Sequence, residues 1–340
     1  MNSWRSWSLW RSHNLLAHLL LLGVVLVWGT TFSLVKAALA DTTPQIFNLL
    51  RMTLAFAVLA TVNHASLRSV KAEELRLGAV AGLCLGLGYQ LQTTGLMYTT
   101  ASRAAFITGL VVVIVPLLSA VPGVHPRRPQ AAQPHTLAPA SQFDSPPDPE
   151  AELRPTLDTF SGALLAFAGL ILLTTPPGEG LALFAGIGLG EWLCLGCALA
   201  FAAHLLTLAR AAPLVPARRL GTLQIGFAAV VMLLTLPLGG RPHFHATAVV
   251  WFALAVTAVL ATAAAFTIQS WAQQHLPASH TALILTLEPV FAWLVSLLFL
   301  GEHLGHRGLL GAGLILAGIL MAELRPLTRG RSQPLPLSGA

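Results

Sequence analysis

The chain has 340 residues, of which 55% are hydrophobic and only 9% are charged. A soluble domain carries about 25% charged residues, so this composition excludes an ordinary soluble fold and favours an integral membrane protein. The net charge of +6 does not indicate a nucleic-acid partner, because the basic residues are spread one or two per loop instead of gathering on one face.

Ten apolar segments follow one another along the chain, and each is roughly long enough to cross a bilayer as a helix. A helix satisfies its own backbone hydrogen bonds, which lipid cannot do. The segments cover residues 15–38, 44–62, 77–98, 101–121, 157–175, 187–209, 220–238, 248–271, 281–300 and 309–322. The sequence therefore predicts an all-α, polytopic membrane bundle of about ten transmembrane helices.

The first apolar segment is preceded by Arg5 and Arg11, as in a signal peptide. It is longer than the apolar region of a signal peptide, and no small-residue cleavage site follows it. We predict a retained first helix.

Basic residues are distributed unevenly between alternate loops. If the N-terminus is cytoplasmic, the opposite side receives only Arg103, Arg241 and Arg307, and all other loop arginines and lysines face the cytoplasm. Loops rich in Lys and Arg stay on the cytoplasmic side. The sequence therefore predicts an even number of helices, both termini in the cytoplasm, and a multi-pass protein of a bacterial inner (plasma) membrane.

Residues 122–156 form a long segment rich in Pro, Ala, Gln and His. Such a composition buries too little apolar area to fold, so we predict a disordered cytoplasmic loop. It divides the chain into residues 1–121 with four helices and residues 157–175 with a fifth. Five more helices occupy residues 186–325, and residues 326–340 form a cytoplasmic tail.

A weak internal repeat relates the two halves. Five residues of the first half recur at one constant spacing in the second: Gln92, Ala101, Ser102, Ala105 and Ile107 become Gln269, Ala278, Ser279, Ala282 and Ile284. Five helices are an odd number, so the second copy must enter the membrane upside down. Inverted repeats are frequent in secondary transporters, which place the substrate near the midplane between the halves.

Several motifs together resemble the EamA-type permeases of the drug/metabolite transporter superfamily. They are W-G-T-T-F at residues 28–32 followed by Lys36, Arg51 in the second segment, residues 98–116, and L-E-P-V-F-A-W-L-V-S-L-L-F-L-G-E-H-L at residues 287–304. The resemblance implies ten helices in two inverted repeats, cytoplasmic termini, and export or exchange of small metabolites. One departure is that the turn Gly301-Glu302 has no counterpart after the fourth helix, where the Pro-rich segment lies.

Charged side chains within a membrane are costly and are candidates for function. Lys36 lies near the outer end of the first helix, where it contacts substrate or extends to the headgroups. Arg51 lies about two turns into the second helix, where it contacts substrate, forms a structural ion pair or caps a helix. Glu288 lies about two turns into the ninth helix, and Pro289 should free a carbonyl near Leu285 and unwind the helix locally. A buried carboxyl group there binds a proton or a cation, or else links two helices.

Uncharged polar and aromatic residues complete the predicted substrate site. Gln92 and Gln269 are related by the repeat, so they face one cavity or link helices by hydrogen bonds. His204 titrates near neutral pH or serves as a hydrogen-bonded scaffold. The remaining candidates are Tyr98 and two tryptophans that wall an apolar site, Trp28 and Trp293.

We expect no metal and no cofactor. Cys194 and Cys197 form a single C-x-x-C without a second pair, and no nucleotide-binding or hydrolase motif is present. We predict a secondary transporter, not an enzyme, that moves a small organic metabolite or drug-like compound by alternating access in the lipid bilayer, with protons as a possible coupling ion. The sequence gives no support for an oligomer. The alternatives are a membrane enzyme acting on a lipid-type substrate, for which only Glu302, His303 and His306 cluster, and a degenerate structural paralogue.

Overall fold

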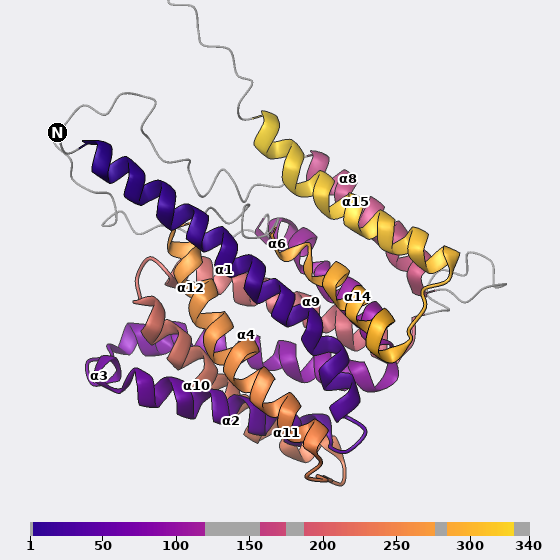
Figure 1. The fold of residues 1–340 in the computed structure, drawn as a ribbon, viewed down its shortest axis with the longest axis horizontal. Helices are drawn as coiled ribbons and strands as arrows, with labels where there is room; N and C mark the ends of the chain where they lie inside the picture. The colour runs from indigo at the N-terminus through magenta and orange to yellow at the C-terminus, as the bar shows by residue number, and fades with distance from the viewer. Residues whose placement is uncertain (1–2, 120–156, 175–186, 276–283, 330–340) are drawn as a thin grey trace, which may run out of the picture.

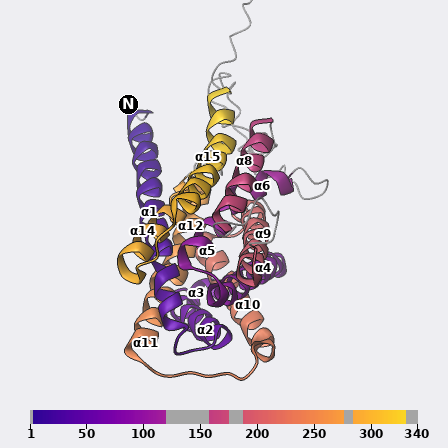
Figure 2. The same ribbon diagram turned by 90° about the vertical axis from the view of Figure 1, so that its right-hand side faces the viewer.

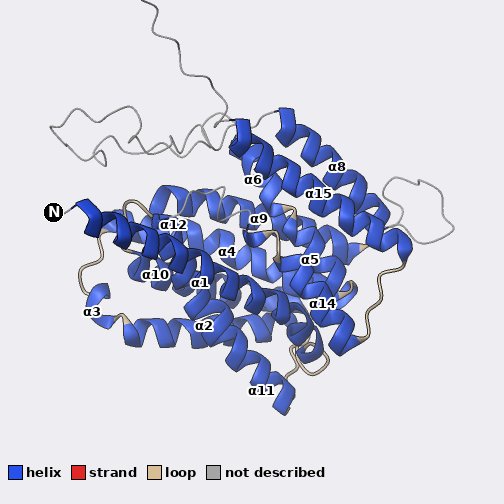
Figure 3. Ribbon diagram, turned by 45° about the horizontal axis from the view of Figure 1, so that its top comes forward, coloured by secondary structure: helices blue, strands red, loops and turns tan. Residues whose placement is uncertain are grey.

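The computed structural model of the protein describes residues 3–119, 157–174, 187–275 and 284–329. These residues form helices and loops, with one isolated bridge between Thr42 and Phe244 in place of any strand (Figure 3). The predicted loop at residues 122–156 lies outside the described residues. The tail predicted from residue 326 begins in helix, because the last helix continues to Arg329.

The first half of the chain contains seven described helices, which follow one another in Figure 1. They are α1 (Ser3–Ala38), α2 (Pro44–Val62), α3 (His64–Leu67), α4 (Ala72–Tyr98), α5 (Ala101–Gly109), α6 (Val111–Ser119) and α8 (Leu157–Thr174).

The second half begins with α9 (Leu189–Ala211) and α10 (Ala217–Thr235), which ends in a 3₁₀ turn, η2 (Leu236–Gly239). The next helix is continuous but changes type: α11 (Ala248–Ala255) leads into the π-helix η3 (Val256–Ala264) and then α12 (Ala265–His275). The last two are α14 (Glu288–Leu300) and α15 (His306–Arg329).

Within the described residues, six helices are long and apolar enough to cross a membrane. They lie at Leu15–Ala38, Pro44–Val62, Ala101–Leu118, Leu189–Ala211, Ala217–Gly239 and Ala248–Ala272. Three shorter apolar helices lie at Phe160–Thr174, Glu288–Leu300 and His306–Met321. The predicted all-α membrane bundle is confirmed, and the predicted apolar segments are helical where they are described, except at Leu110, residues 187–188 and Thr286–Leu287.

The predicted helices at residues 101–121 and 281–300 are both interrupted, and the two breaks lie at matching places in the repeat. The segment predicted as one helix over residues 101–121 divides at Leu110 into α5 and α6. In the second half, residues 284–285 are helical, Thr286 and Leu287 form a turn, and α14 begins at Glu288. Leu110 and Leu287 are separated by the same spacing as Gln92 and Gln269, so the repeat extends to its breaks.

The predicted unwinding at Pro289 is therefore present, but Glu288 is the first residue of α14 and not two turns inside a helix. Proline has no N–H to donate and fits the first turn of a helix. For this reason the helix restarts immediately before Pro289.

Glycine permits close packing between the helices. On α4, Gly78, Gly82 and Gly86 face α10 so closely that an added Cβ would lie 2.5–2.8 Å from side chains of that helix. Small-residue faces favour helix association in lipid, because the hydrophobic effect does not drive helices together there and close van der Waals packing must do so. This packing places α4 between α10 and α9 (Figure 2).

A separate pair, α8 and α15, lies side by side along one flank of the bundle (Figures 1 and 2). An added Cβ on Gly311 would lie 2.6 Å from the carbonyl oxygen of Gly169, and one on Gly169 would lie 2.5 Å from that of Gly311. The two backbones are therefore in direct contact.

Candidate functional site

A cavity of about 70 Å³ lies at the centre of the bundle. A buried water needs about 10–15 Å³ on this measure, so the cavity has room for several waters or a small solute. Its walls come from both halves of the chain: Trp28, Thr31, Phe32, Tyr89, Gln92, Thr108, Gly109, Val111, Phe201, His204, Leu205, Phe266, Gln269, Leu285 and Glu288.

The lining residues of α4, α5 and α6 are related to those of α12 and α14 by the internal repeat. Each of four pairs keeps the spacing that separates Gln92 from Gln269. The pairs are Tyr89 with Phe266, Gln92 with Gln269, Thr108 with Leu285, and Val111 with Glu288. The two glutamines line one cavity.

The lining residues of α1 and α9 are also paired. Trp28, Thr31 and Phe32 on α1 match Phe201, His204 and Leu205 on α9 at a second constant spacing. Gly109 is the one lining residue whose counterpart, Thr286, is not in the described lining. The cavity therefore lies where the two repeats meet, and equivalent positions of both repeats line it.

The hydrogen-bond donors of the α1 and α9 walls are already used within the protein. Trp28 Nε1 donates to the carbonyl oxygen of Ala261 at 2.8 Å, and Thr31 Oγ1 donates to that of Trp28 at 2.7 Å. His204 Nε2 lies 2.7 Å from Gln224 Oε1, to which it donates in this amide orientation. These groups are held as scaffold and are not free to bind a solute.

Two acceptors of the lining have no such partner. No hydrogen bond or ion pair involves the Glu288 carboxylate within the described part of the chain, and Gln269 Oε1 is buried without a hydrogen-bond partner there. Buried polar atoms are normally paired. An unpaired acceptor beside a cavity is therefore a candidate contact for a ligand.

Arg51 lies behind this cavity in a second one of only about 10 Å³, which shares Thr31, Phe32 and Gln92 with the first. Its Nε donates to Thr262 Oγ1 at 2.8 Å, and its guanidinium carbon lies 4.1 Å from the centre of the Tyr89 ring. The side chain is 2% exposed. Arg51 links α2 to the π-helix η3 and supports the wall of the central cavity.

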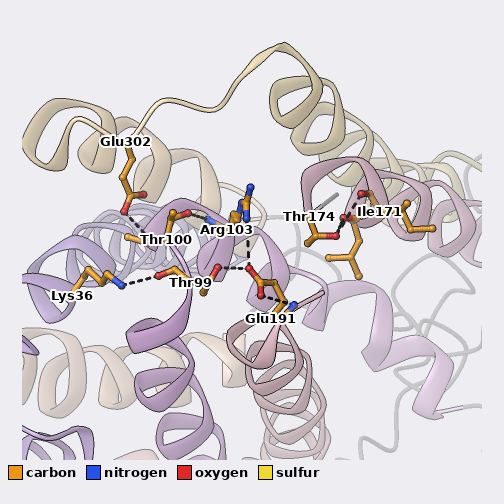
Figure 4. Close-up of polar contacts among 11 residues, drawn as sticks. Lys36, Thr99, Thr100, Arg103, Ile171, Thr174, Glu191 and Glu302 are labelled. Carbon is orange, nitrogen blue, oxygen red and sulfur yellow. Dashed lines mark hydrogen bonds and ion pairs between the residues drawn. The ribbon is translucent and has the colours of Figure 1, made fainter. Parts of the chain in front are cut away.

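A polar network joins the helices near the α4–α5 turn, as Figure 4 shows. Lys36 at the end of α1 donates to the carbonyl oxygens of Leu96 at 2.5 Å and Thr99 at 2.8 Å. These carbonyls end α4, where the helix dipole favours a cation. Thr99 Oγ1 donates to Glu191 of α9 at 2.6 Å, so the turn is held from two sides.

Glu302 binds the start of α5 from the loop between α14 and α15. Its carboxylate accepts hydrogen bonds from the backbone N–H groups of Ala101 and Ser102, both at 3.1 Å, and from two hydroxyls, those of Ser102 and Ser296. Burial raises the pKa of Glu302, but these hydrogen bonds outweigh it and hold the pKa below its ordinary value. Gly301, with φ of +64°, turns the chain so that Glu302 reaches α5.

The structure brings five of the predicted site residues to the central cavity: Trp28, Gln92, His204, Gln269 and Glu288. It does not bring the other four there. Lys36 caps α4, Arg51 lies in the neighbouring cavity, and Tyr98 is 58% exposed at the end of α4. Trp293 is half-buried on α14 and packs against the core outside the described lining.

The aromatic lining was missed from the sequence. Tyr89, Phe201 and Phe266 form a cluster in which the ring centres of Tyr89 lie 5.3 Å from Phe201 and 6.1 Å from Phe266. The signal was present, because Tyr89 precedes Gln92 as Phe266 precedes Gln269. The Glu302 contacts join residues about 200 positions apart, and no local pattern predicts them.

No group of three or more His, Cys, Asp or Glu residues that could hold a metal lies within the described ranges. Cys194 and Cys197 are free thiols buried on α9. Of the residues proposed for a lipid enzyme, Glu302 caps α5, whereas His303 and His306 are exposed.

Comparison with known proteins points to one family. Residues 15–129 and 188–324 match the EamA-like transporter family. An uncharacterized transporter of Archaeoglobus fulgidus is 32% identical over 302 residues, which cover 89% of this chain and 84% of that protein. A protein of known crystal structure shares 20% identity with a TM-score of 0.56, over 93% of this chain and 99% of that one; at this identity the likeness concerns the fold.

Proposed function

This chain belongs to the EamA-like transporter family, and from that premise we propose that it is a secondary transporter of a small organic molecule. The central cavity is its substrate site, and the two repeats expose that site alternately to the two sides of the membrane.

One observation carries the proposal: all but one of the residues around the cavity form pairs related by the repeat. A site between two inverted repeats can be reached from either side when one repeat moves against the other. The breaks at Leu110 and at Thr286–Leu287 border this cavity. They supply short non-helical segments where each repeat can bend.

The test fills the cavity with one large side chain. Leu205 lines the cavity from α9, and Leu199, one and a half turns earlier on the same helix, is 51% exposed on the outer surface. We expect Leu205→Trp to abolish counterflow of every solute that the wild type carries in proteoliposomes, whereas Leu199→Trp leaves counterflow unchanged. Melting of both purified variants checks the fold. Wild-type counterflow by a folded Leu205→Trp protein would show that the substrate uses another path.

We propose protons as the coupling ion, with Glu288 as the group that carries them. Glu288 is the acidic residue of the described lining, and Tyr89 and His204 are the other titratable side chains on its wall. Its position at the start of α14, beside the helix break, lets a movement of α14 change its surroundings.

The orientation is part of the same proposal: a bacterial inner membrane protein with both termini in the cytoplasm. This places Lys36, Glu191 and Glu302 at the outer end of the bundle. A reporter fused to the C-terminus should be active only in the cytoplasm. An outward-facing reporter would reverse the assignment of the two ends.

A further inference from the structure

The polar groups of the central cavity favour a positively charged ligand. The N–H of Trp28, the hydroxyl of Thr31 and the ring N–H of His204 are all bound within the protein. The Glu288 carboxylate, by contrast, has no partner among the described residues. A ligand that enters this cavity therefore meets an unpaired carboxyl group, and no free cationic side chain lies on the described part of its walls.

Aromatic rings form a large part of the remaining described wall, beside Gln92, Gln269 and aliphatic side chains. Trp28 and Phe266 lie 5.3 Å apart between ring centres, and Phe201 and Tyr89 continue the cluster. The faces of aromatic rings carry partial negative charge and attract organic cations within about 6 Å. Rings also provide apolar contact for the carbon skeleton of a ligand.

We propose that the ligand of this cavity is a compact organic monocation, an amine or quaternary ammonium compound with an apolar body. Its cationic end lies beside Glu288, and its body lies among Trp28, Phe201 and Phe266. The inference rests on the proposed transport function, whose site it specifies.

The repeat fixes which end of the cavity holds the charge. The counterpart of Glu288 in the first repeat is Val111, which is apolar and lines the same cavity. This is the described pair in which a carboxyl group on one repeat matches an apolar side chain on the other, so it sets the polarity of the site. The ammonium group therefore lies on the α14 side and not at the centre.

Arg51 does not convert the site into one for anions or zwitterions. The small cavity on which Arg51 opens measures about 10 Å³, which is room for about one water. A ligand carboxylate would have to remain in the central cavity, where Glu288 would repel it.

The test compares the binding of matched probes to the purified full chain in nanodiscs by calorimetry in mildly alkaline buffer. The probes are phenethylamine, its trimethylated derivative, phenethyl alcohol, phenylacetate and phenylalanine. We expect both cations to bind, and the other three to bind about tenfold or more weakly. Glu288→Gln should weaken binding of the amine about tenfold to a hundredfold, as for loss of a charged hydrogen bond. Asp41→Asn, which removes a carboxylate at the α1–α2 turn, is the matched control and should change nothing.

A second variant exchanges the two paired residues. Val111→Glu combined with Glu288→Val moves the carboxylate to the equivalent position of the first repeat, and we expect it to regain cation binding that Glu288→Gln has lost. Equal binding of amine and alcohol by the wild type would overturn the inference, as would a preference for phenylalanine or phenylacetate. Amine binding that is unchanged in a folded Glu288→Gln protein would also overturn it.

The substrate class and the transport function fail in different ways. If a neutral or anionic solute is carried and Leu205→Trp blocks it, the cation assignment is wrong and the transport function stands. If the cations bind with the expected ranking but no solute crosses the membrane, the cavity chemistry stands and the transport function is wrong.

Discussion

Glu302 offers the sharpest test of how the bundle is held together. Replacing it with alanine removes the acceptor for two backbone N–H groups and the Ser102 hydroxyl at the start of α5, and for the Ser296 hydroxyl on α14. Ala101 and Ser102 are both 0% exposed, so their N–H groups would lose their partner in a place that water reaches poorly.

The expected loss can be estimated from these contacts. An unsatisfied buried donor costs about 1–3 kcal/mol, and removing the cap of a helix costs about 1 kcal/mol. Glu302 itself is half-buried at the end of the bundle, so water can occupy part of the space that the side chain leaves. We therefore expect Glu302→Ala to lower the free energy of unfolding by about 2 kcal/mol.

The assay is reversible unfolding of the purified protein in mixed micelles, followed by circular dichroism. His303→Ala, at the neighbouring exposed position, is the matched control and should be neutral. Glu302→Gln keeps one acceptor oxygen and should lose about half as much as the alanine variant, about 1 kcal/mol. A loss for Glu302→Ala no larger than that for His303→Ala would refute the conclusion that this side chain joins α5 to the last helices.

Three further predictions concern pH, coupling and packing. The pKa of Glu302 is below its ordinary value in the folded protein. The stabilisation that this side chain provides should therefore be complete above the unfolded-state pKa of about 4.3 and be lost as the pH falls through the folded-state pKa. Unfolding measured from neutral to acidic pH should show the free energies of unfolding of wild type and Glu302→Gln converging only in acid. Glu288→Gln should abolish uptake driven by a pH gradient while downhill flux at saturating substrate persists; in proteoliposomes, driven uptake equal to the wild type would remove Glu288 from coupling. Gly311→Ala should destabilise by about 1–3 kcal/mol because its Cβ would meet the Gly169 carbonyl, whereas Gly313→Ala, with open space around it, should be neutral or stabilising in thermal unfolding.

The helices could be predicted because lipid leaves the chain few choices. A long uncharged apolar run must form a helix to satisfy its backbone, and this argument needs no tertiary contact. Helix type and breaks were harder to predict. The division at Leu110 falls between Gly109 and a run of Val and Ile. A single glycine is tolerated inside a helix, so comparison with Leu287, close to Pro289 in the other repeat, was needed to indicate the break.

The residues of the site could be predicted only where their angular positions around the helix were compared. Tyr89 and Gln92 are three residues apart and share one face of α4. Tyr98 is six residues beyond Gln92, which at about 100° per residue places it about 240° around the helix. The sequence therefore contained the reason why Tyr98 lies away from the cavity, and why Tyr89 lines it.

Lys36 and Glu302 illustrate a different limit. Each satisfies backbone groups of the α4–α5 turn from a distant part of the chain. A charged residue near a helix end can extend to the headgroups, bind a ligand or cap another helix, and composition does not distinguish these roles. Only the arrangement of the helices shows that both residues cap helix ends.

The π-helix η3 makes the two halves of the molecule energetically unequal. In the first repeat, α4 is α-helical throughout Ala72–Tyr98, whereas its counterpart contains nine π-helical residues at Val256–Ala264. Hydrogen bonds from residue i to i+5 wind the chain differently from those of an α-helix. The side chains of α4 and α12 therefore match at the cavity, but beyond η3 the side chains of α11 point in other directions than their counterparts on α4. Strictly symmetric repeats would give inward-facing and outward-facing forms of equal free energy. In the proposed alternating-access cycle the π-helix lifts that degeneracy, so we expect the empty protein to rest mainly in one form, and a ligand to populate the other form only by binding it more tightly.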